Sequence, residues 1–145
     1  MKKIRVAFFL MLIIFVIVVL LSTPVLAVQD KKEIKLQLKN LENDKTAAVE
    51  AAKTEARARI ICNSNKKAHT NHWLIYPIDA DHFRIQNRNS LLYLEVADAD
   101  KSEGAEVQQW SNTRHICQEW KLVNLENNIY KIINRNSCKV LTKSE

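Results

Sequence analysis

The sequence predicts a mostly β domain preceded by an α-helical segment. Three observations lead to this fold class. The composition changes at Cys62, short runs of strand-forming residues recur after that point, and one unit of sequence occurs there twice. The chain has 145 residues, which is enough for one modest domain.

Residues 1–27 have the features of a signal peptide. A basic stretch over residues 2–5 precedes an unbroken apolar run over residues 6–21. Val25 and Ala27 fit the positions three and one before a signal-peptidase cut, so we expect cleavage after Ala27. The apolar run only just falls short of a membrane-spanning length, and a retained membrane anchor is therefore the alternative. Both alternatives place the rest of the chain outside the cytoplasm, secreted or anchored.

Residues 28–61 predict a helical spacer. This stretch lacks Gly, Pro and aromatic residues. It is rich in Ala, Lys and Glu, which are strong helix formers. Ile34, Leu38 and Leu41 have coiled-coil spacing, but the pattern fades after two heptads. We therefore favour a solvated spacer over a short coiled coil that dimerises the protein.

Charge and cysteine content narrow the classes of partner. The net charge of +6 falls to +3 without the three basic residues of the signal, which is too weak and scattered to indicate nucleic-acid binding. Cys62, Cys117 and Cys138 are an odd number, so at least one thiol stays unpaired or is shared with another chain.

From Cys62 onward, short runs rich in β-branched and aromatic residues alternate with Asn- and Asp-rich segments, as in an all-β barrel or sandwich. Gly104 is the only glycine of the chain, so we expect Asn and Asp to serve most tight turns. The predicted strands are Trp73–Tyr76, His82–Gln86, Leu91–Val96, Glu106–Trp110, Trp120–Val123, Ile129–Ile133 and Cys138–Leu141.

An internal repeat is the most specific feature of the sequence. Residues 64–95 align without a gap on residues 111–142, an offset of 47. Trp73 falls on Trp120, and an Asn-Arg-Asn-Ser block recurs at residues 87–90 and 134–137. Such a period indicates one supersecondary unit used repeatedly, with neighbouring copies burying each other's apolar faces.

The repeat resembles that of ricin-type lectin domains. The resemblance rests on Phe83-Arg-Ile-Gln-Asn-Arg-Asn-Ser, then Leu94-Glu-Val, Gly104-Ala-Glu-Val-Gln-Gln-Trp and the QxW motif Gln118-Glu-Trp. In that family three repeats close a β-trefoil, and each repeat can carry a shallow sugar pocket. The resemblance therefore implies a partial ricin-type β-trefoil, of about two incomplete repeats, over residues 62–145.

The resemblance also implies a carbohydrate-binding site. Glu95 matches the carboxylate that accepts hydrogen bonds from two sugar hydroxyls, and Gln108 and Trp110 match the strand that lines the pocket. A flat aromatic ring suits an apolar sugar face, while amide and carboxylate groups select the hydroxyl pattern. Gln118 matches the glutamine that braces the carboxylate from behind.

Several positions depart from the family pattern. Glu95 replaces an Asp, Cys117 replaces an Asn, and the Gly of the family's Ser-Gly-Lys is Leu91 in one copy and Cys138 in the other. Loss of affinity with retention of the fold is therefore the alternative to sugar binding.

The other copies match the pocket less well. Thr142 stands at the second carboxylate position, and Asn63 stands at the upstream tryptophan position, so we expect no pocket at either place. Trp73 and Trp120 are predicted to lie in the core.

Metal and catalytic sites are not expected. Cys62, His69 and His72 lack an evident fourth ligand, and Ser90 and Ser137 have no histidine in register, so the sequence predicts neither a cofactor nor an enzyme.

Fewer than two full repeats cannot close a trefoil. The chain is therefore truncated, assembles with further chains as a homo-oligomer, or uses the preceding residues to cover the gap. The leading hypothesis is a non-catalytic module that binds galactose-like or cell-wall glycans, with membrane contact only through an uncleaved N-terminal segment. The alternative is a structural or protein-interaction module that has lost sugar binding.

Overall fold

The computed structural model describes residues 35–64, 69–127 and 129–143. The predicted signal peptide and the first residues of the predicted spacer lie outside these ranges. In the described part of the chain, no helix combines the length and apolar character needed to cross a membrane. The strands are β1 (Lys35–Leu36), β2 (Thr46–Val49), β3 (Ile60–Asn63), β4 (Trp73–Pro77), β5 (His82–Asn87), β6 (Tyr93–Val96), β7 (Val107–Trp110), β8 (Trp120–Glu126) and β9 (Ile129–Asn134). Within the described ranges, four short 3-10 helices lie between these strands: η1 (Glu50–Ala52), η2 (His69–Asn71), η3 (Ala97–Ala99) and η4 (Ile116–Gln118).

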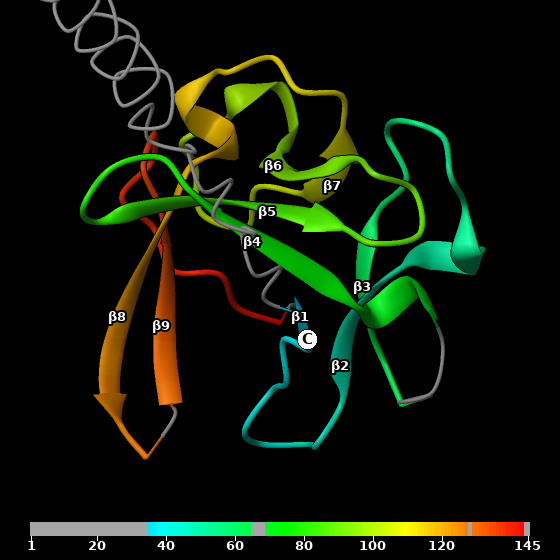
Figure 1. Ribbon diagram of the computed structural model, residues 1–145, viewed down its shortest axis with the longest axis horizontal. Helices are drawn as coiled ribbons and strands as arrows, with labels where there is room; N and C mark the ends of the chain where they lie inside the picture. The colour runs from blue at the N-terminus through cyan, green and yellow to red at the C-terminus, as the bar shows by residue number, and fades with distance from the viewer. Residues whose placement is uncertain (1–34, 65–68, 128, 144–145) are drawn as a thin grey trace, which may run out of the picture. The chain divides into compact units, whose positions relative to one another are not determined.

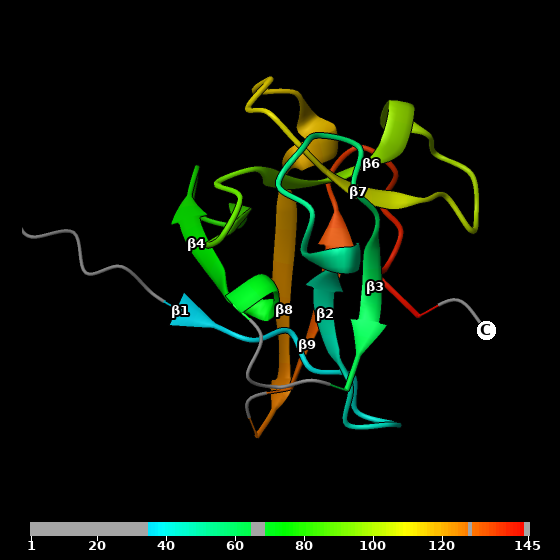
Figure 2. The ribbon, with the colours of Figure 1, turned by 90° about the vertical axis from the view of Figure 1, so that its right-hand side faces the viewer.

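The strands form two antiparallel sheets. One follows the order β1-β4-β5-β6-β7, with β8 paired to both β5 and β9, and the other is the β2–β3 hairpin. In Figure 1, β4 and β5 run between the β8–β9 hairpin on one side and the β2–β3 hairpin on the other. Figure 2 shows β6, β7 and the turn of η4 gathered at one end of the domain. The mostly β fold class is confirmed.

The register of the strands repeats every 47 residues. Leu36 of β1 pairs with Trp73 of β4, and 47 residues further on Phe83 of β5 pairs with Trp120 of β8. The β2–β3 hairpin and the β6–β7 hairpin correspond in the same way. Residues 35–63 therefore form a first repeat, ahead of the two that the sequence predicts.

The helical spacer prediction is wrong for the described residues 35–61. Ala48 is fully buried, Val49 is 2% exposed, and both lie in β2, while Ala51 has a left-handed backbone with a φ of 49°. Helix propensity is a weak preference that tertiary packing overrides. Small alanine side chains suit an interior position beside the core, whereas Leu41, assigned to a coiled-coil seam, is 71% exposed.

An asparagine organises the same turn in all three repeats. The backbone N–H groups of Asn40, Asn87 and Asn134 each donate to the carbonyl five residues further on, at 2.8, 2.8 and 2.9 Å. The Oδ1 atom of each accepts two backbone N–H groups from the following residues. Asn side chains readily satisfy turn backbones in this way.

The prediction that Asn and Asp serve most tight turns is wrong for the positive-φ positions of the described residues, most of which hold other residue types. At the position of the family's glycine, Asp44, Leu91 and Cys138 have φ angles of 60°, 61° and 58°. The backbone of each repeat therefore has a left-handed conformation at this position, whichever residue occupies it. The last predicted strand, Cys138–Leu141, is reduced to one bridge between Val140 and Ile133.

Two tryptophans anchor the core, as predicted. Trp73 is fully buried and Trp120 is 1% exposed. Their Nε1–H groups donate to the carbonyls of Ala47 and Leu94, each at 3.0 Å. Ile85 lies with them in the core, and residues of the first repeat also belong to it. Of the three explanations for the short length, the structure shows the one in which the preceding residues join the fold.

Candidate functional site

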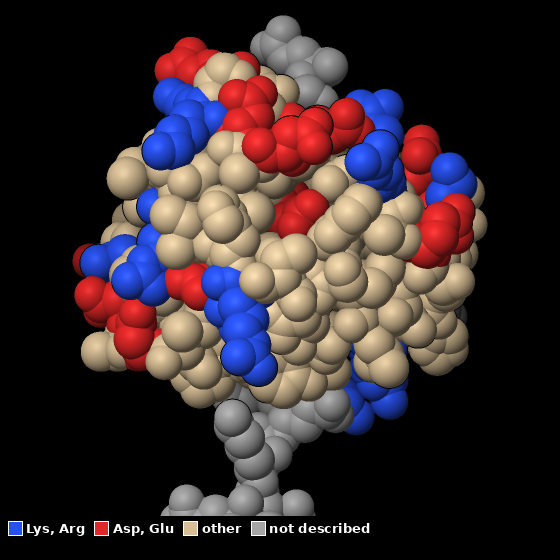
Figure 3. All heavy atoms as spheres, turned by 90° about the horizontal axis from the view of Figure 1, so that it is seen from above, with Lys and Arg blue, Asp and Glu red and all other residues tan. Residues whose placement is uncertain are grey.

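A pocket of about 480 Å³ lies at the end of the domain where β6, β7 and η4 meet. Figure 3 views the molecule from above, and on this face charged side chains lie mainly around the border, with one acidic side chain recessed among uncharged neighbours. The pocket is lined by Arg57, Glu95, Ala97, Asp98, Ala99, Glu106, Gln108, Trp110, Thr113, His115 and Cys117. Three of the four predicted site residues are thus among its walls.

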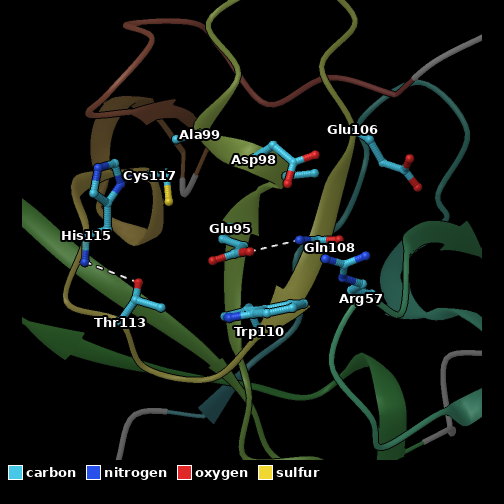
Figure 4. Close-up of a pocket in the computed structure, with 11 residues that line it drawn as sticks. Arg57, Glu95, Asp98, Ala99, Glu106, Gln108, Trp110, Thr113, His115 and Cys117 are labelled. Atoms are coloured by element: carbon cyan, nitrogen blue, oxygen red, sulfur yellow. Dashed lines mark hydrogen bonds between the residues drawn. The ribbon is translucent and has the colours of Figure 1, made fainter.

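Glu95 supplies the carboxylate of the pocket (Figure 4). It pairs with Gln108 across β6 and β7, and its side chain is only 6% exposed. Its Oε1 atom accepts a hydrogen bond from Gln108 Nε2 at 2.8 Å, and its Oε2 atom accepts one from Gln118 Nε2 at 2.8 Å. An ionised carboxylate has about four acceptor sites, so the two oxygens keep capacity for ligand hydroxyls.

Gln118 lies behind this carboxylate, as the resemblance implies. It is fully buried at the end of η4, and its Nε2 atom also donates to the Ser111 carbonyl at 2.7 Å. Its Oε1 atom accepts the Thr113 backbone N–H at 3.1 Å. Because all of these groups are bonded, Gln118 holds Glu95 in one position and fixes the loop that follows β7.

Trp110 forms one side of the pocket at the end of β7. Its half-buried ring lies on the same side of Glu95 as Gln108 and Arg57, and the Glu95 carboxylate stands above it in Figure 4. The structure therefore places a flat apolar surface beside a fixed carboxylate and an amide. The assignment of Glu95, Gln108, Trp110 and Gln118 to sugar binding remains a prediction.

Cys117 occupies the position where the family often has Asn. Burial, together with the negative charge of Glu95, raises the pKa of the thiol to about 11. The thiol is therefore protonated at neutral pH and offers only a weak hydrogen-bond donor to the pocket. Cys62, Cys117 and Cys138, which all lie in described ranges, are free thiols.

Arg57 lines the pocket although sequence reasoning missed it. It belongs to the first repeat, in the stretch predicted as a spacer, and its guanidinium carbon lies 5.3 Å from the centre of the Trp110 ring. Asp98 and His115 were also missed. The offset of 47 places Arg57 on Gly104, and these two residues have φ angles of 70° and 75°.

The other two repeats have different residues at the position of Glu95, and the first repeat also differs at that of Trp110. Ala48 stands at the position of Glu95 and is fully buried, and Asn63 stands at the position of Trp110. Thr142 stands at the third carboxylate position. Only the second repeat therefore places a carboxylate at this point.

His69 and His72 lie beside each other. Their rings are arranged edge to face, with the ring centroids 6.2 Å apart. Within residues 35–64, 69–127 and 129–143, no three His, Cys, Asp or Glu side chains gather in a way that could hold a metal ion.

Comparison with known proteins identifies relatives of this fold. The chain is 47% identical over 51 residues to the clotting factor G alpha subunit of Tachypleus tridentatus, a match that covers 35% of this chain and 8% of that protein. The designed 3-fold symmetric protein ThreeFoil matches with a TM-score of 0.71 and 29% identity over 73% of this chain and 76% of its own. An exo-β-1,3-galactanase from Clostridium thermocellum matches with a TM-score of 0.70 and 23% identity, over 72% of this chain and 23% of the enzyme.

A family model matches most of the chain. The model of the ricin-type beta-trefoil lectin domain-like family matches residues 25–110 and again residues 72–145. These two ranges overlap at the second repeat, which agrees with the strand register and with the turns that Asn40, Asn87 and Asn134 share. The first range includes the residues predicted to form a spacer. The chain belongs to the ricin-type beta-trefoil lectin domain-like family.

Proposed function

We propose that this protein is a non-catalytic carbohydrate-binding module that holds one sugar in the Glu95 pocket. The observation that carries the proposal is the Glu95 carboxylate, fixed by two amides at 2.8 Å and set beside the Trp110 ring. Sugar sites combine an aromatic surface with a few fixed polar groups in this way. Galactose-like or cell-wall glycans are the proposed ligands.

The pocket favours binding over catalysis. Hydrolysis of a glycoside by most enzymes needs two carboxyl groups, one of which is free to donate a proton. Both oxygens of Glu95 already accept amide hydrogen bonds, and the neighbouring Glu106 is paired with Arg59. This arrangement suits recognition of hydroxyl groups.

A glycan array with the wild type and four variants tests the proposal. Glu95→Gln keeps the size of the side chain but removes its charge, and Trp110→Ala removes the aromatic wall. We expect both to weaken binding at least about 10-fold, since each removes a contact worth about 1.5 kcal/mol or more. Glu103→Gln and Glu126→Gln are matched controls on exposed side chains outside the lining of the pocket and should bind as the wild type does.

Two outcomes would contradict this assignment. If Glu95→Gln and Trp110→Ala bind as well as the wild type, the sugar lies elsewhere. If the folded wild type binds no glycan, the alternative of a structural or protein-interaction module stands. The second outcome has support in the first and third repeats, where Ala48 and Thr142 replace the carboxylate.

We also propose that the module acts outside the cytoplasm, after cleavage at Ala27 or as an anchored protein. N-terminal sequencing of the protein recovered from the medium and from membranes distinguishes these forms. A product that begins at Val28 in the medium supports cleavage, and a full-length product in the cytoplasm contradicts export.

A further inference from the structure

Arg57 reaches the pocket from a different repeat, through a segment that the fold holds firmly. Its backbone N–H donates to the Gln109 carbonyl at 2.9 Å, and the Gln109 N–H donates to the Ala58 carbonyl at 2.9 Å. The Gln109 side chain is fully buried and donates to the carbonyls of Lys53 and Glu55 at 3.1 and 2.8 Å. Gln109 thus ties the loop of residues 53–58 to β7, next to the two pocket residues of that strand.

The Arg57 guanidinium is a charge without a counterion. In the described part of the chain it forms no ion pair. Glu106, two residues before Gln108, the β-bridge partner of Arg59, is already paired with Arg59. The guanidinium instead lies over the Trp110 ring, a favourable cation–π arrangement. A guanidinium has five N–H donors, and stacking on a ring leaves those at its edge free for a planar anion.

Figure 4 shows how the charged groups of the pocket are arranged. Arg57 lies beside Gln108 and near Trp110, on the same side of the ring as Glu95, and the acidic side chains Asp98 and Glu106 lie further from that ring. A neutral sugar stacked on Trp110 competes with the guanidinium for this ring face. A sugar that carries an anionic group on its edge uses both, because its hydroxyls meet Glu95 while its anion meets Arg57.

We propose that the ligand of this pocket is an acidic sugar whose carboxylate or sulfate pairs with Arg57. This inference rests on the proposed function and adds the class of sugar. Charge-assisted, bidentate pairs of arginine with oxyanions are among the strongest hydrogen bonds in proteins, so the charge should dominate the choice between otherwise identical sugars.

Matched monosaccharides test the inference on the full chain. Galacturonate and galactose differ only at C6, as do glucuronate and glucose, and galactosamine supplies a cationic comparison. Titration calorimetry should show at least about 10-fold tighter binding of a uronate than of its neutral partner at low ionic strength. The preference should shrink at 1 M salt, where charges at an exposed site are screened.

Three variants assign the preference to Arg57. Arg57→Gln should bring the ratio of the two affinities close to 1, because it removes the charge that pairs with the anion. Arg57→Lys should restore only part of the preference, because lysine keeps the charge without the planar fork. Arg88→Gln makes the same charge change at an exposed turn and should leave the ratio unchanged.

The outcomes separate this inference from the proposed function. Equal affinity for neutral and acidic sugars, tighter binding of galactosamine, or an unchanged ratio in Arg57→Gln would overturn the inference while leaving sugar binding in place. Failure of the folded wild type to bind any of the five sugars, together with a blank glycan array, would overturn both.

Discussion

The first and second repeats share a backbone but differ in the chemistry that they display. Ala48 faces Ile61 across the β2–β3 hairpin at the place where Glu95 faces Gln108 across β6–β7. In the first repeat Asn71, at the position of Gln118, donates to the Thr46 hydroxyl at 3.0 Å. The comparison shows that a trefoil repeat keeps its fold through a few shared interior groups, while the position of Ala48 and Glu95 can carry either an apolar or an acidic side chain.

The largest expected effect comes from the groups that both repeats share. Trp73→Ala and Trp120→Ala should each lower the free energy of unfolding by about 3–5 kcal/mol, because each removes a buried ring and leaves a carbonyl without its partner. Urea denaturation followed by circular dichroism measures this. Trp110→Ala, at the half-buried pocket wall, should cost less than half as much.

A large difference between Trp73→Ala and Trp120→Ala would contradict the equivalence of the two repeats. Their matching exposures, 0% and 1%, and their equal hydrogen-bond lengths predict similar losses.

The next largest effect on stability distinguishes the second repeat from the first. Gln109 in the second repeat is fully buried, and its Oε1 atom accepts the Ser90 hydroxyl at 2.7 Å in addition to its bonds with the loop of residues 53–58. Gln109→Ala should therefore lower the free energy of unfolding by about 2–3 kcal/mol. Cys62 occupies the equivalent position in the first repeat, where it is half-buried, and Cys62→Ala should cost less than about 1 kcal/mol.

Limited proteolysis gives a second measure of Gln109→Ala, because release of its loop should expose residues 53–58 to cleavage. Equal stability losses for the two variants, or a loop that stays protected, would show that Gln109 does not hold the loop.

The second and third repeats could be predicted from the sequence because their signals are strong. The Asn-Arg-Asn-Ser block and the two buried tryptophans align without a gap, and they fixed both the family and the position of Glu95. The hydrogen bonds from Gln108 and Gln118 to this carboxylate agree with the roles that the resemblance implied.

The first repeat was missed for a physical reason. It has Leu36 and Leu38 where the second repeat has Phe83 and Ile85, and alanines fill its hairpin, so its composition is that of a helix. The tertiary partners that make it a strand, such as Trp73, lie outside the segment. The local clues were few: Asn40, Val49, Ala52 and Ala58 each precede an identical residue by the same offset of 47.

Arg57 was missed for the same reason, since a residue from one repeat completes the pocket of the next. Its approach to Trp110 depends on the buried Gln109, which short-range patterns do not reveal.

The smallest expected effect concerns the left-handed turn that all three repeats share. Leu91, with a φ of 61°, has a side chain that disfavours this conformation by about 1–2 kcal/mol, whereas Asp44, with a φ of 60°, tolerates it better. Glycine is more flexible in the unfolded chain, which offsets part of the gain. Leu91→Gly should therefore raise the free energy of unfolding by about 0.5–1 kcal/mol, and Asp44→Gly should change it less.

Thermal and urea unfolding of the wild type, Leu91→Gly, Asp44→Gly and Leu91→Ala tests this last comparison. Leu91→Ala removes the same exposed apolar side chain, which is 61% exposed, but keeps a Cβ atom and hence the strain, so it should be close to neutral. If Leu91→Ala raises the free energy of unfolding as much as Leu91→Gly does, the effect comes from removal of the exposed apolar side chain and not from the backbone conformation. A gain in Leu91→Gly alone would show that the turn geometry belongs to the repeat, and that each copy accommodates it with the residue it has.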